Sequence, residues 1–455
     1  MIIRATEVET VSNKIRKFVG LAVAGVLTLS FLGLEANAAE YFLRADTTTV
    51  TMPDGEVIHM WGYAEDADGD LSTEDGVVTV PGPELRVPTG DSTLIVHLKN
   101  NLPVPSSLMV LGQTSDGSTP TFDGGRVLSL TDEAASGGGT VTYTWTDIRP
   151  GTFLYASGTN PAVQVQMGLY GALAADLEDG PLCAPAPGGG TCYPGIVYDE
   201  DLILLFSEID PALHAAVEAD DYGPGKTMTS TINYAPKYFL INGVAKTAGS
   251  APIEIGTGGD RLLIRFLNAG LQTHMPVIQG FYMNIVADDG FPVPYPPEQY
   301  SIMLTAGKTH DAIFQLACSD LPEPIKSTGT FALYDRRVQN LSNAGAAGDG
   351  GMMTAFTLMD ADGENIADIC DNCLGVPNAA QVDTDGDLYG NVCDADLNND
   401  HYVNFADVPV MVRAFIWQDL NGDLNEDDSV NFGDIARFLE LYNDSPGPSG
   451  LHSQQ

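Results

Sequence analysis

The stretch GTFLYASGTNPAVQVQMGLYGAL, residues 151–173, decides the fold. It predicts a β-strand, a turn at Ser157-Gly158, and a second apolar run that ends in Gly168-Leu169-Tyr170-Gly171. From residue 41 to about residue 173, the pattern is one of short strands separated by turns, with no convincing helix. Val57–Tyr63 is apolar on both faces, and Leu94, Val96 and Leu98 share one face of a second strand. Regularly spaced strands of this kind predict a β-sandwich.

Two segments resemble the copper motifs of multicopper oxidases. GTFLYASG is similar to the end of that family's first cupredoxin domain, where GTYWYHSH leads to a Gly-Leu-Tyr-Gly close. Gly82–Gln113 is similar to the family's first motif, Ser106-Ser107-Leu108 matching its lead and Gly112 its close. The resemblance implies that the four histidine ligands of this domain fall on what we call the ligand-equivalent positions, namely Met109, Leu111, Ala156 and Gly158.

The resemblance extends over residues 39–358, since a Pro- and Gly-rich linker near 182–194 leads to a second β-pattern with a buried run at 202–206. We therefore predict a mainly β protein with two cupredoxin-like β-sandwich domains and a small calcium-binding, EF-hand-like or dockerin-like α module. The expected parts are a signal peptide (1–38), cupredoxin-like domains (39–180 and 181–358), thrombospondin type 3-like repeats (359–394), a dockerin-like module (395–444) and a flexible tail (445–455).

The N-terminus predicts export. Lys14, Arg16 and Lys17 precede an apolar run from Phe18 to Leu34, and Ala36-Asn37-Ala38 is typical of a cleavage site. The alternative is a transmembrane anchor, and no later segment could span a bilayer. The formal net charge of −41 excludes ordinary nucleic-acid binding, which requires basic patches.

The acidity is concentrated after Asp360, where 20 Asp and Glu residues face only two Arg. Twelve-residue windows recur at 360–371, 383–394, 396–407 and 423–434, each with oxygen-bearing side chains at positions one, three and five. Calcium takes six to eight oxygen ligands, and alternate residues of a tight loop all point inward. The predicted side-chain ligands are Asp360, Asp362, Glu364, Asp368 and Asp371; Asp383, Asp385, Asp387, Asn391 and Asp394; Asp396, Asn398, Asp400 and Asp407; and Asp423, Asn425, Asp427 and Asp434.

Windows one and two, with Asn378, Gln381 and the flanking cysteines, resemble thrombospondin type 3 repeats, which implies a Cys373–Cys393 disulfide. Windows three and four resemble dockerin type I loops, each followed by an amphipathic helix. Position six, usually Gly, is His401 or Asp428 here. Positions ten and eleven, which face the cohesin partner in many dockerins, are Phe405-Ala406 and Phe432-Gly433. An alternative for this segment is a disordered acidic tail.

Six cysteines in an exported chain predict three disulfides with fifteen possible pairings. Cys183 and Cys192 flank a Pro/Gly loop that they are expected to close. Cys318 and Cys370 are then paired by elimination only, and the alternative is a set of free buried thiols.

The function follows from the ligand-equivalent positions. A trinuclear copper cluster uses more histidines than the seven in this chain, and no Cys lies beside a His. A reduced copper site from Met109, Met167, His274, Met275 and Met283 is an alternative to methionines that fill cores. The cofactor expected is therefore calcium, and copper is not expected.

Three hypotheses for the function result. The first is an extracytoplasmic, non-catalytic binding or structural protein whose partner is an extracellular protein, a glycan or a second copy, without a membrane anchor after signal cleavage. The second is a copper-dependent oxidoreductase with an unconventional site. The third is an accessory of extracellular polysaccharide breakdown, because dockerins often accompany such enzymes.

Overall fold

The computed structural model describes residues 38–88, 91–176, 190–256, 261–316, 318–321, 329–343 and 350–451, all within the unit Ala38–Gln455. Almost all of the predicted signal peptide, Cys183, and the side chains of Cys192 and His452 lie outside these described residues. No helix in the described part of the chain combines the length and apolar character that a membrane crossing needs. The domain boundaries given above stay predictions.

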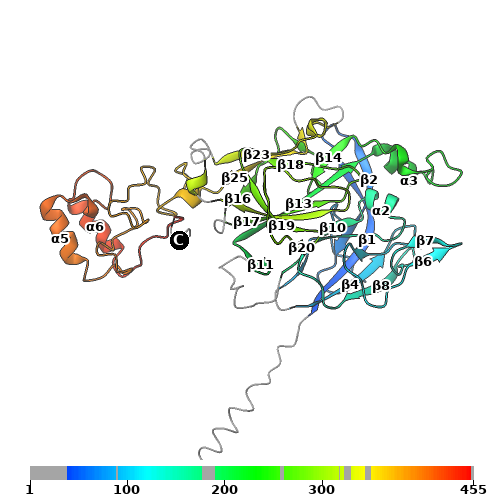
Figure 1. The fold of residues 1–455 in the computed structure, drawn as a ribbon, viewed down its shortest axis with the longest axis horizontal. Coiled ribbons are helices and arrows are strands. Elements are labelled where there is room, and N and C mark those ends of the chain that lie inside the picture. The colour runs from blue at the N-terminus through cyan, green and yellow to red at the C-terminus, as the bar shows by residue number, and fades with distance from the viewer. Residues whose placement is uncertain are drawn as a thin grey trace, which may run out of the picture. The chain divides into compact units, whose positions relative to one another are not determined.

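The first sandwich consists of two four-stranded sheets, with the orders β2-β1-β4-β8 and β3-β10-β9-β5. Their strands can be followed in Figure 1. Leu94, Val96 and Leu98 are fully buried between the sheets, which confirms the predicted inward face of β4. The strands are β1 (Ala38–Thr51), β2 (Val57–Glu65), β3 (Leu85–Val87), β4 (Thr93–Asn100), β5 (Met109–Val110), β8 (Gly139–Trp145), β9 (Gly151–Ala156) and β10 (Tyr170–Ala175).

The stretch 151–173 forms β9, then helix α2 (Pro161–Met167), then the start of β10. The expectation of no helix before residue 173 is therefore wrong. Pro161 supplies a φ suited to the first helical turn, and Gly168, with φ 121°, ends the helix in a conformation open to glycine. Gly171 allows close packing, because a Cβ there would lie 2.3 Å from the Tyr155 hydroxyl oxygen.

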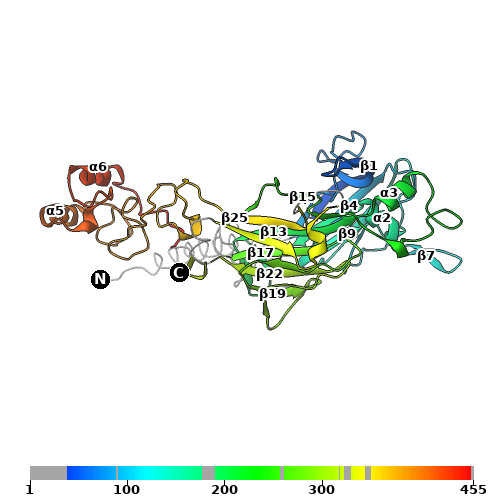
Figure 2. The same ribbon diagram turned by 90° about the horizontal axis from the view of Figure 1, so that it is seen from above.

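The second sandwich has one sheet in the order β14-β13-β17-β22-β19-β20, with β21 paired to β19, and a second in the order β16-β25-β23-β18. Figure 2 shows β13, β17, β22 and β19 as successive strands. Phe206, Phe266, Phe314 and Phe356 lie in the core between the sheets. The strands are β13 (Glu200–Ile209), β14 (Tyr238–Ile241), β16 (Ile253–Ile255), β17 (Arg261–Asn268), β18 (Pro276–Ile278), β19 (Met283–Asp288), β20 (Phe291–Pro292), β21 (Glu298–Gln299), β22 (Thr309–Gln315), β23 (Thr330–Asp335) and β25 (Met353–Leu358).

Short elements connect and flank these sheets. Helix α3 (Pro211–Glu218) follows β13, and its N-cap Asp210 accepts a hydrogen bond from the Ala212 N–H. The two-stranded ladders are β6 (Thr121–Asp123) with β7 (Arg126–Ser129), β11 (Gly190–Tyr193) with β12 (Ile196–Tyr198), and β15 (Lys246–Thr247) with β24 (Gly350–Gly351). The 3₁₀ turns are η1 (Thr231–Asn233), η2 (Cys318–Asp320), η3 (Val338–Leu341), η4 (Asp368–Cys370) and η5 (Leu420–Gly422).

A buried ionic cluster joins the two sandwiches. The fully buried Arg265 of β17 donates to Asp201 of β13 (2.7 Å) and to Asp176, which follows β10 of the first sandwich (2.9 Å). Thr152 of β9 donates to Asp311 of β22 at 2.5 Å. Burial raises the pKa of Asp311 despite the nearby Arg265 charge. Buried charges of this kind require partners, so the cluster fixes how the sheets meet.

The acidic segment folds around its own small core. Helices α5 (Val408–Trp417) and α6 (Phe432–Glu440) lie side by side in Figure 1 and pack Met411, Ala414 and Phe438 together. The structure contains the two disulfides expected among its described cysteines, Cys373–Cys393 and Cys318–Cys370. The second of these ties the chain after β22 to the start of the acidic segment.

Candidate metal sites

The ligand-equivalent positions lie on or just after strands of one sheet of the first sandwich. Met109 of β5 lies directly opposite Ala156 of β9 in an antiparallel pair. The N–H of Leu111 donates to the carbonyl of Leu154 (2.9 Å), and the N–H of Leu130 donates to the carbonyl of Gly158 (3.0 Å). The backbone frame is therefore in place, whereas the four side chains offer one thioether and no imidazole.

Buried hydroxyl groups occupy the space beside Gly158. The Thr159 hydroxyl lies 3.0 Å from each of the Ser107 and Ser129 hydroxyls, which are themselves 3.0 Å apart. It also lies 3.0 Å from the carboxylate of Glu133. No local sequence pattern indicates this network, because its members come from three separate segments of the chain.

Four histidines in the described part of the chain contact protein groups other than the ligand-equivalent positions. His59 pairs with Glu218 (3.2 Å), and His97 pairs with Glu40 (2.7 Å). His214 lies 2.8 Å from the His59 carbonyl, and His310 contacts the Met303 carbonyl. Every group of three or more His, Cys, Asp or Glu that could hold an ion within the described ranges consists of carboxylates alone.

His274 forms a buried ionic triad that the sequence did not predict. Its Nδ1 lies 2.9 Å from Asp335 and its Nε2 lies 3.2 Å from Glu208, with all three side chains inaccessible to solvent. Burial alone would lower the pKa of His274, but the hydrogen bonds to Asp335 and Glu208 outweigh burial and raise it. The ring is thus held between two carboxylates, not in the backbone-capping role that a loop histidine suggests.

The alternative copper site of methionines and His274 is not assembled. Met167 lies in the core of the first sandwich, and Met283 lies in the core of the second. These two thioethers belong to different cores, so the five residues do not share one site. Met167 and Met283 therefore act as core-filling residues.

The four acidic windows share one backbone conformation. Position six has a left-handed φ in each window, at Asn365 (71°), Leu388 (78°), His401 (70°) and Asp428 (62°). Position four is left-handed as well, at Gly363, Gly386, Asn399 and Glu426. A non-glycine residue rarely adopts this region, so its recurrence at the same two positions indicates one loop type.

Carboxylates converge in three of the four windows. Oxygens within 4.8 Å of one another come from Asp362, Glu364 and Asp371; from Asp383, Asp385 and Asp387; and from Asp423, Asp427 and Asp434. Window three forms no such group among the described residues, although its Asp396 accepts hydrogen bonds from N–H groups of its own window, as Asp383 and Asp423 do in theirs. Burial, together with neighbouring carboxylates, raises the pKa of Asp362, Glu364 and Asp385, and that of Asp394 to about 8. The ligand sets of all four windows stay predictions.

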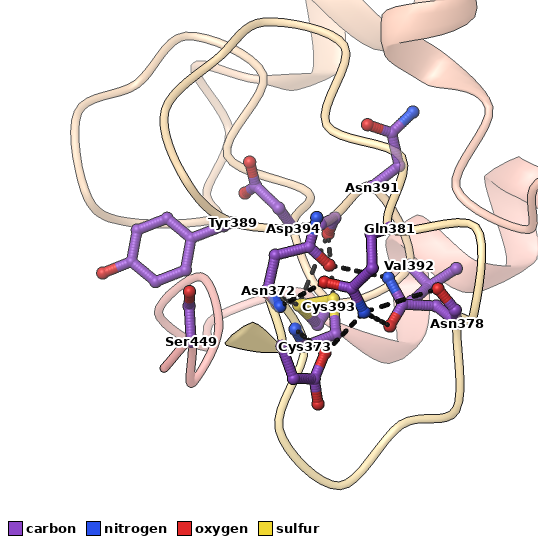
Figure 3. The surroundings of a disulfide bond; sticks show 12 residues. Asn372, Cys373, Asn378, Gln381, Tyr389, Asn391, Val392, Cys393, Asp394 and Ser449 are labelled. Atoms are coloured by element: carbon purple, nitrogen blue, oxygen red, sulfur yellow. Dashed lines mark hydrogen bonds between the residues drawn. A yellow bond between two sulfur atoms is a disulfide. The ribbon is translucent and has the colours of Figure 1, made fainter. Parts of the chain in front are cut away.

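Amide side chains surround the Cys373–Cys393 disulfide, as Figure 3 shows. Gln381 accepts from the N–H of Asn372 (2.7 Å), and Asn378 donates to the Asn372 side chain (2.7 Å). Asn391, a predicted ligand, accepts from the Thr384 N–H and donates to the carbonyl of Asp423 in window four. Its amide therefore links two windows.

The β-sandwich regions are similar to known proteins. Two family models, both described as multicopper oxidase, match residues 75–178 and 200–320. The blue copper oxidase from Nitrosomonas europaea is similar in structure, with 21% identity, a TM-score of 0.53, and coverage of 70% of this chain and 86% of that one. A structure named multicopper oxidase mgLAC gives 22% identity, a TM-score of 0.52 and the same coverage. The search of curated proteins gives no significant match.

These matches correct the cofactor prediction. The prediction that calcium is the cofactor and that copper is not expected is wrong. Both matching family models describe multicopper oxidases, and these imply copper. The ligand-equivalent positions themselves do not fit copper, since Leu111, Ala156 and Gly158 have no donor side chain. The mainly β, cupredoxin-like fold is as predicted. Through its two β-sandwich regions, at residues 75–178 and 200–320, the chain is similar to the multicopper oxidase family.

Proposed function

We propose that this protein is a non-catalytic binding protein that works outside the cytoplasm. The observation that carries the proposal is the pairing of Met109 with Ala156, because the strands that would present copper ligands meet there without an imidazole. The type 1 centre and trinuclear cluster with which multicopper oxidases reduce dioxygen hold their coppers with imidazole and thiolate ligands. The four cysteines whose side chains the structure describes, Cys318, Cys370, Cys373 and Cys393, are all in disulfides.

The surroundings of these positions support the same proposal. Hydroxyl groups of Ser107, Ser129 and Thr159 bond to one another and leave the network beside Gly158 satisfied. A fully bonded buried polar network stabilises one arrangement of the core. This region is therefore built to be stable without ligating imidazoles.

The acidic segment supplies the attachment function in this proposal. Its windows act as structural sites for hard divalent cations, as in thrombospondin type 3 repeats and dockerins. The side chains of Phe405 and Phe432, at position ten of windows three and four, are 76% and 78% exposed. Large exposed apolar side chains of this kind suit a protein or glycan partner, or a second copy.

The test is oxidase activity in the purified full chain after saturation with Cu²⁺. The expected result is oxygen consumption with a phenolic substrate no faster than with the same concentration of free copper. A matched control is the variant Met109→Leu, which removes the one soft donor among the ligand-equivalent positions. Turnover by the wild-type chain that Met109→Leu abolishes would overturn the proposal.

A second candidate is a copper-dependent oxidoreductase with an unconventional site. The two family matches favour it, because the framework is that of copper enzymes. The same experiment decides between the candidates, since stoichiometric copper with turnover supports the second one. The polysaccharide-accessory hypothesis is tested separately, by a glycan array probed with the full chain.

A further inference from the structure

A cavity of about 900 Å³ opens beside Gly158, the last of the ligand-equivalent positions. The β6–β7 hairpin, the start of α2 and the segment that follows α3 form its walls, with Leu128, Val163 and Tyr222 as one lining residue from each. Sites for small organic ligands have volumes of about 300–1,000 Å³ and few polar groups. The size of this cavity therefore suits a small molecule.

The walls of the cavity are mainly apolar. Trp61, Val104 and Val163 lie along the inner side, where they also pack against the first hydrophobic core. Leu128 and Leu130 of the hairpin side are 40% and 44% exposed. A ligand with a flat or branched hydrocarbon body would cover these surfaces and release water from them.

One carboxylate in the wall gives the cavity its charge preference. Glu133 is half-buried, and one of its oxygens accepts a hydrogen bond from the Thr159 hydroxyl (3.0 Å). Its second oxygen has no hydrogen-bond or ion-pair partner in the described part of the chain. The other acidic residues of the lining differ, because Glu218 pairs with His59 and Asp220 pairs with Lys226.

Arg126 is the basic residue among those that line the cavity. Arg126 is exposed on the hairpin, where solvent screens its charge. A half-buried carboxylate with a free oxygen favours a cationic donor, and charge-assisted hydrogen bonds are stronger than neutral ones. Trp61 and Tyr222 add aromatic surface, which also attracts cations.

We propose that this cavity binds a small organic amine, with its hydrocarbon body against Trp61 and Val163 and its ammonium group on Glu133. The inference rests on the proposed non-catalytic role, since Gly158, one of the four ligand-equivalent positions, lines the cavity. It adds the chemical class of the ligand to that role.

The experiment is isothermal titration calorimetry of the copper-free full chain with tryptamine as the probe. Indole-3-propionate, which carries a carboxylate in place of the ammonium, is the matched probe. Tryptamine is expected to bind at least about tenfold more tightly, since a hydrogen bond to a charged group contributes about 1.5–3 kcal/mol. Equal binding of the two probes, or no binding of tryptamine, would overturn the proposal.

Two variants locate the site. Glu133→Gln retains an acceptor for the Thr159 hydroxyl and removes the charge, so it is expected to weaken tryptamine binding about tenfold or more. Asp123→Asn removes an exposed charge of the same hairpin outside the cavity and is expected to leave binding unchanged. Ala162→Trp, at an exposed lining position, is expected to block the cavity without disturbing the core.

The outcomes separate this inference from the proposed function. Unchanged tryptamine affinity in both Glu133→Gln and Ala162→Trp would place binding elsewhere and overturn the inference. Such a result would leave the oxidase assay, and with it the non-catalytic role, unaffected. Conversely, copper-dependent turnover would overturn the non-catalytic role even if tryptamine bound at Glu133.

Discussion

His274 and Asp335 form a hydrogen-bonded ion pair 2.9 Å apart, and neither side chain is accessible to solvent. The Asp335 side chain also accepts from the N–H groups of Met275 and Arg337 and from the Asn340 amide. The bonds from His274, Arg337 and Asn340 hold the pKa of Asp335 below its usual value despite burial. Glu208 lies 3.2 Å from the other ring nitrogen of His274, Nε2. The triad joins β13, β23 and the loop before β18.

The pH dependence of stability is expected to reveal this pair. Because the pKa of His274 is raised, its contribution to stability is complete below the ordinary histidine pKa of about 6.5 and is lost as the pH rises through the higher folded value. The lowered pKa of Asp335 gives a contribution that is lost only as the pH falls below the ordinary range of an aspartate. His274→Asn should lower the free energy of unfolding by about 3–5 kcal/mol at pH 6. Urea unfolding at pH 6 to 9 should show that difference shrinking as the pH rises.

Arg265 is expected to be the most costly charge to remove. Arg265→Met would leave the carboxylates of Asp176 and Asp201 without their shared partner, and loss of one member of a buried pair costs about 3–5 kcal/mol. Denaturation by guanidinium chloride measures the loss. Lys226→Met, in the exposed pair with Asp220, serves as the control and should cost less than about 1 kcal/mol. Equal effects of the two variants would contradict the structural role of the cluster.

Gly171→Ala should destabilise the first sandwich. A Cβ at this position would lie 2.3 Å from the Tyr155 hydroxyl, and overpacking of a well-packed core costs about 1–3 kcal/mol. Gly249→Ala is the matched control, because no atom lies within 4 Å of a Cβ there. Thermal unfolding of the two variants measures the difference, and similar melting temperatures would show that Tyr155 moves freely.

Removal of divalent cations is expected to loosen residues 360–444 alone. Converging carboxylates repel one another when no cation lies between them. Limited proteolysis of the full chain in EDTA should therefore cut this segment and spare the sandwiches, and added Ca²⁺ should restore protection. Asp385→Asn combined with Asp387→Asn should mimic chelation in window two, whereas Asp419→Asn, outside the windows, should not. Identical cleavage with and without EDTA would refute the predicted ligand sets.

Local patterns in the sequence predicted much of the fold. The alternation at Leu94, Val96 and Leu98 identified a buried face, since side chains of a strand alternate between its two sides. Helix α2 was missed because seven residues between two strands are too short for periodicity to separate a helix from a strand. The available signal for this helix was Asn160 followed by Pro161, since Asn is favoured at the N-cap and Pro at the first helical position.

The sites depended on contacts that no local pattern contains. His274 meets partners 61 and 66 residues away in the chain, and Arg265 meets Asp176 at a separation of 89. The cavity beside Gly158 likewise combines residues from β2, β7, α2 and α3, which are far apart in the sequence. By contrast, the acidic windows lie within twelve residues each, so their converging carboxylates were visible in the sequence.

The Cys318–Cys370 disulfide changes how the chain bears mechanical load. Tension applied through the C-terminal segment passes across this covalent bond into the end of β22, and the intervening chain between the two cysteines, 52 positions apart, is shielded from extension. Strands β23 and β25 lie within that shielded loop, so pulling on the tail cannot peel them from the sheet one at a time. In an oxidising environment, a tethered molecule would thus retain its second sandwich under forces that would strip an unlinked edge.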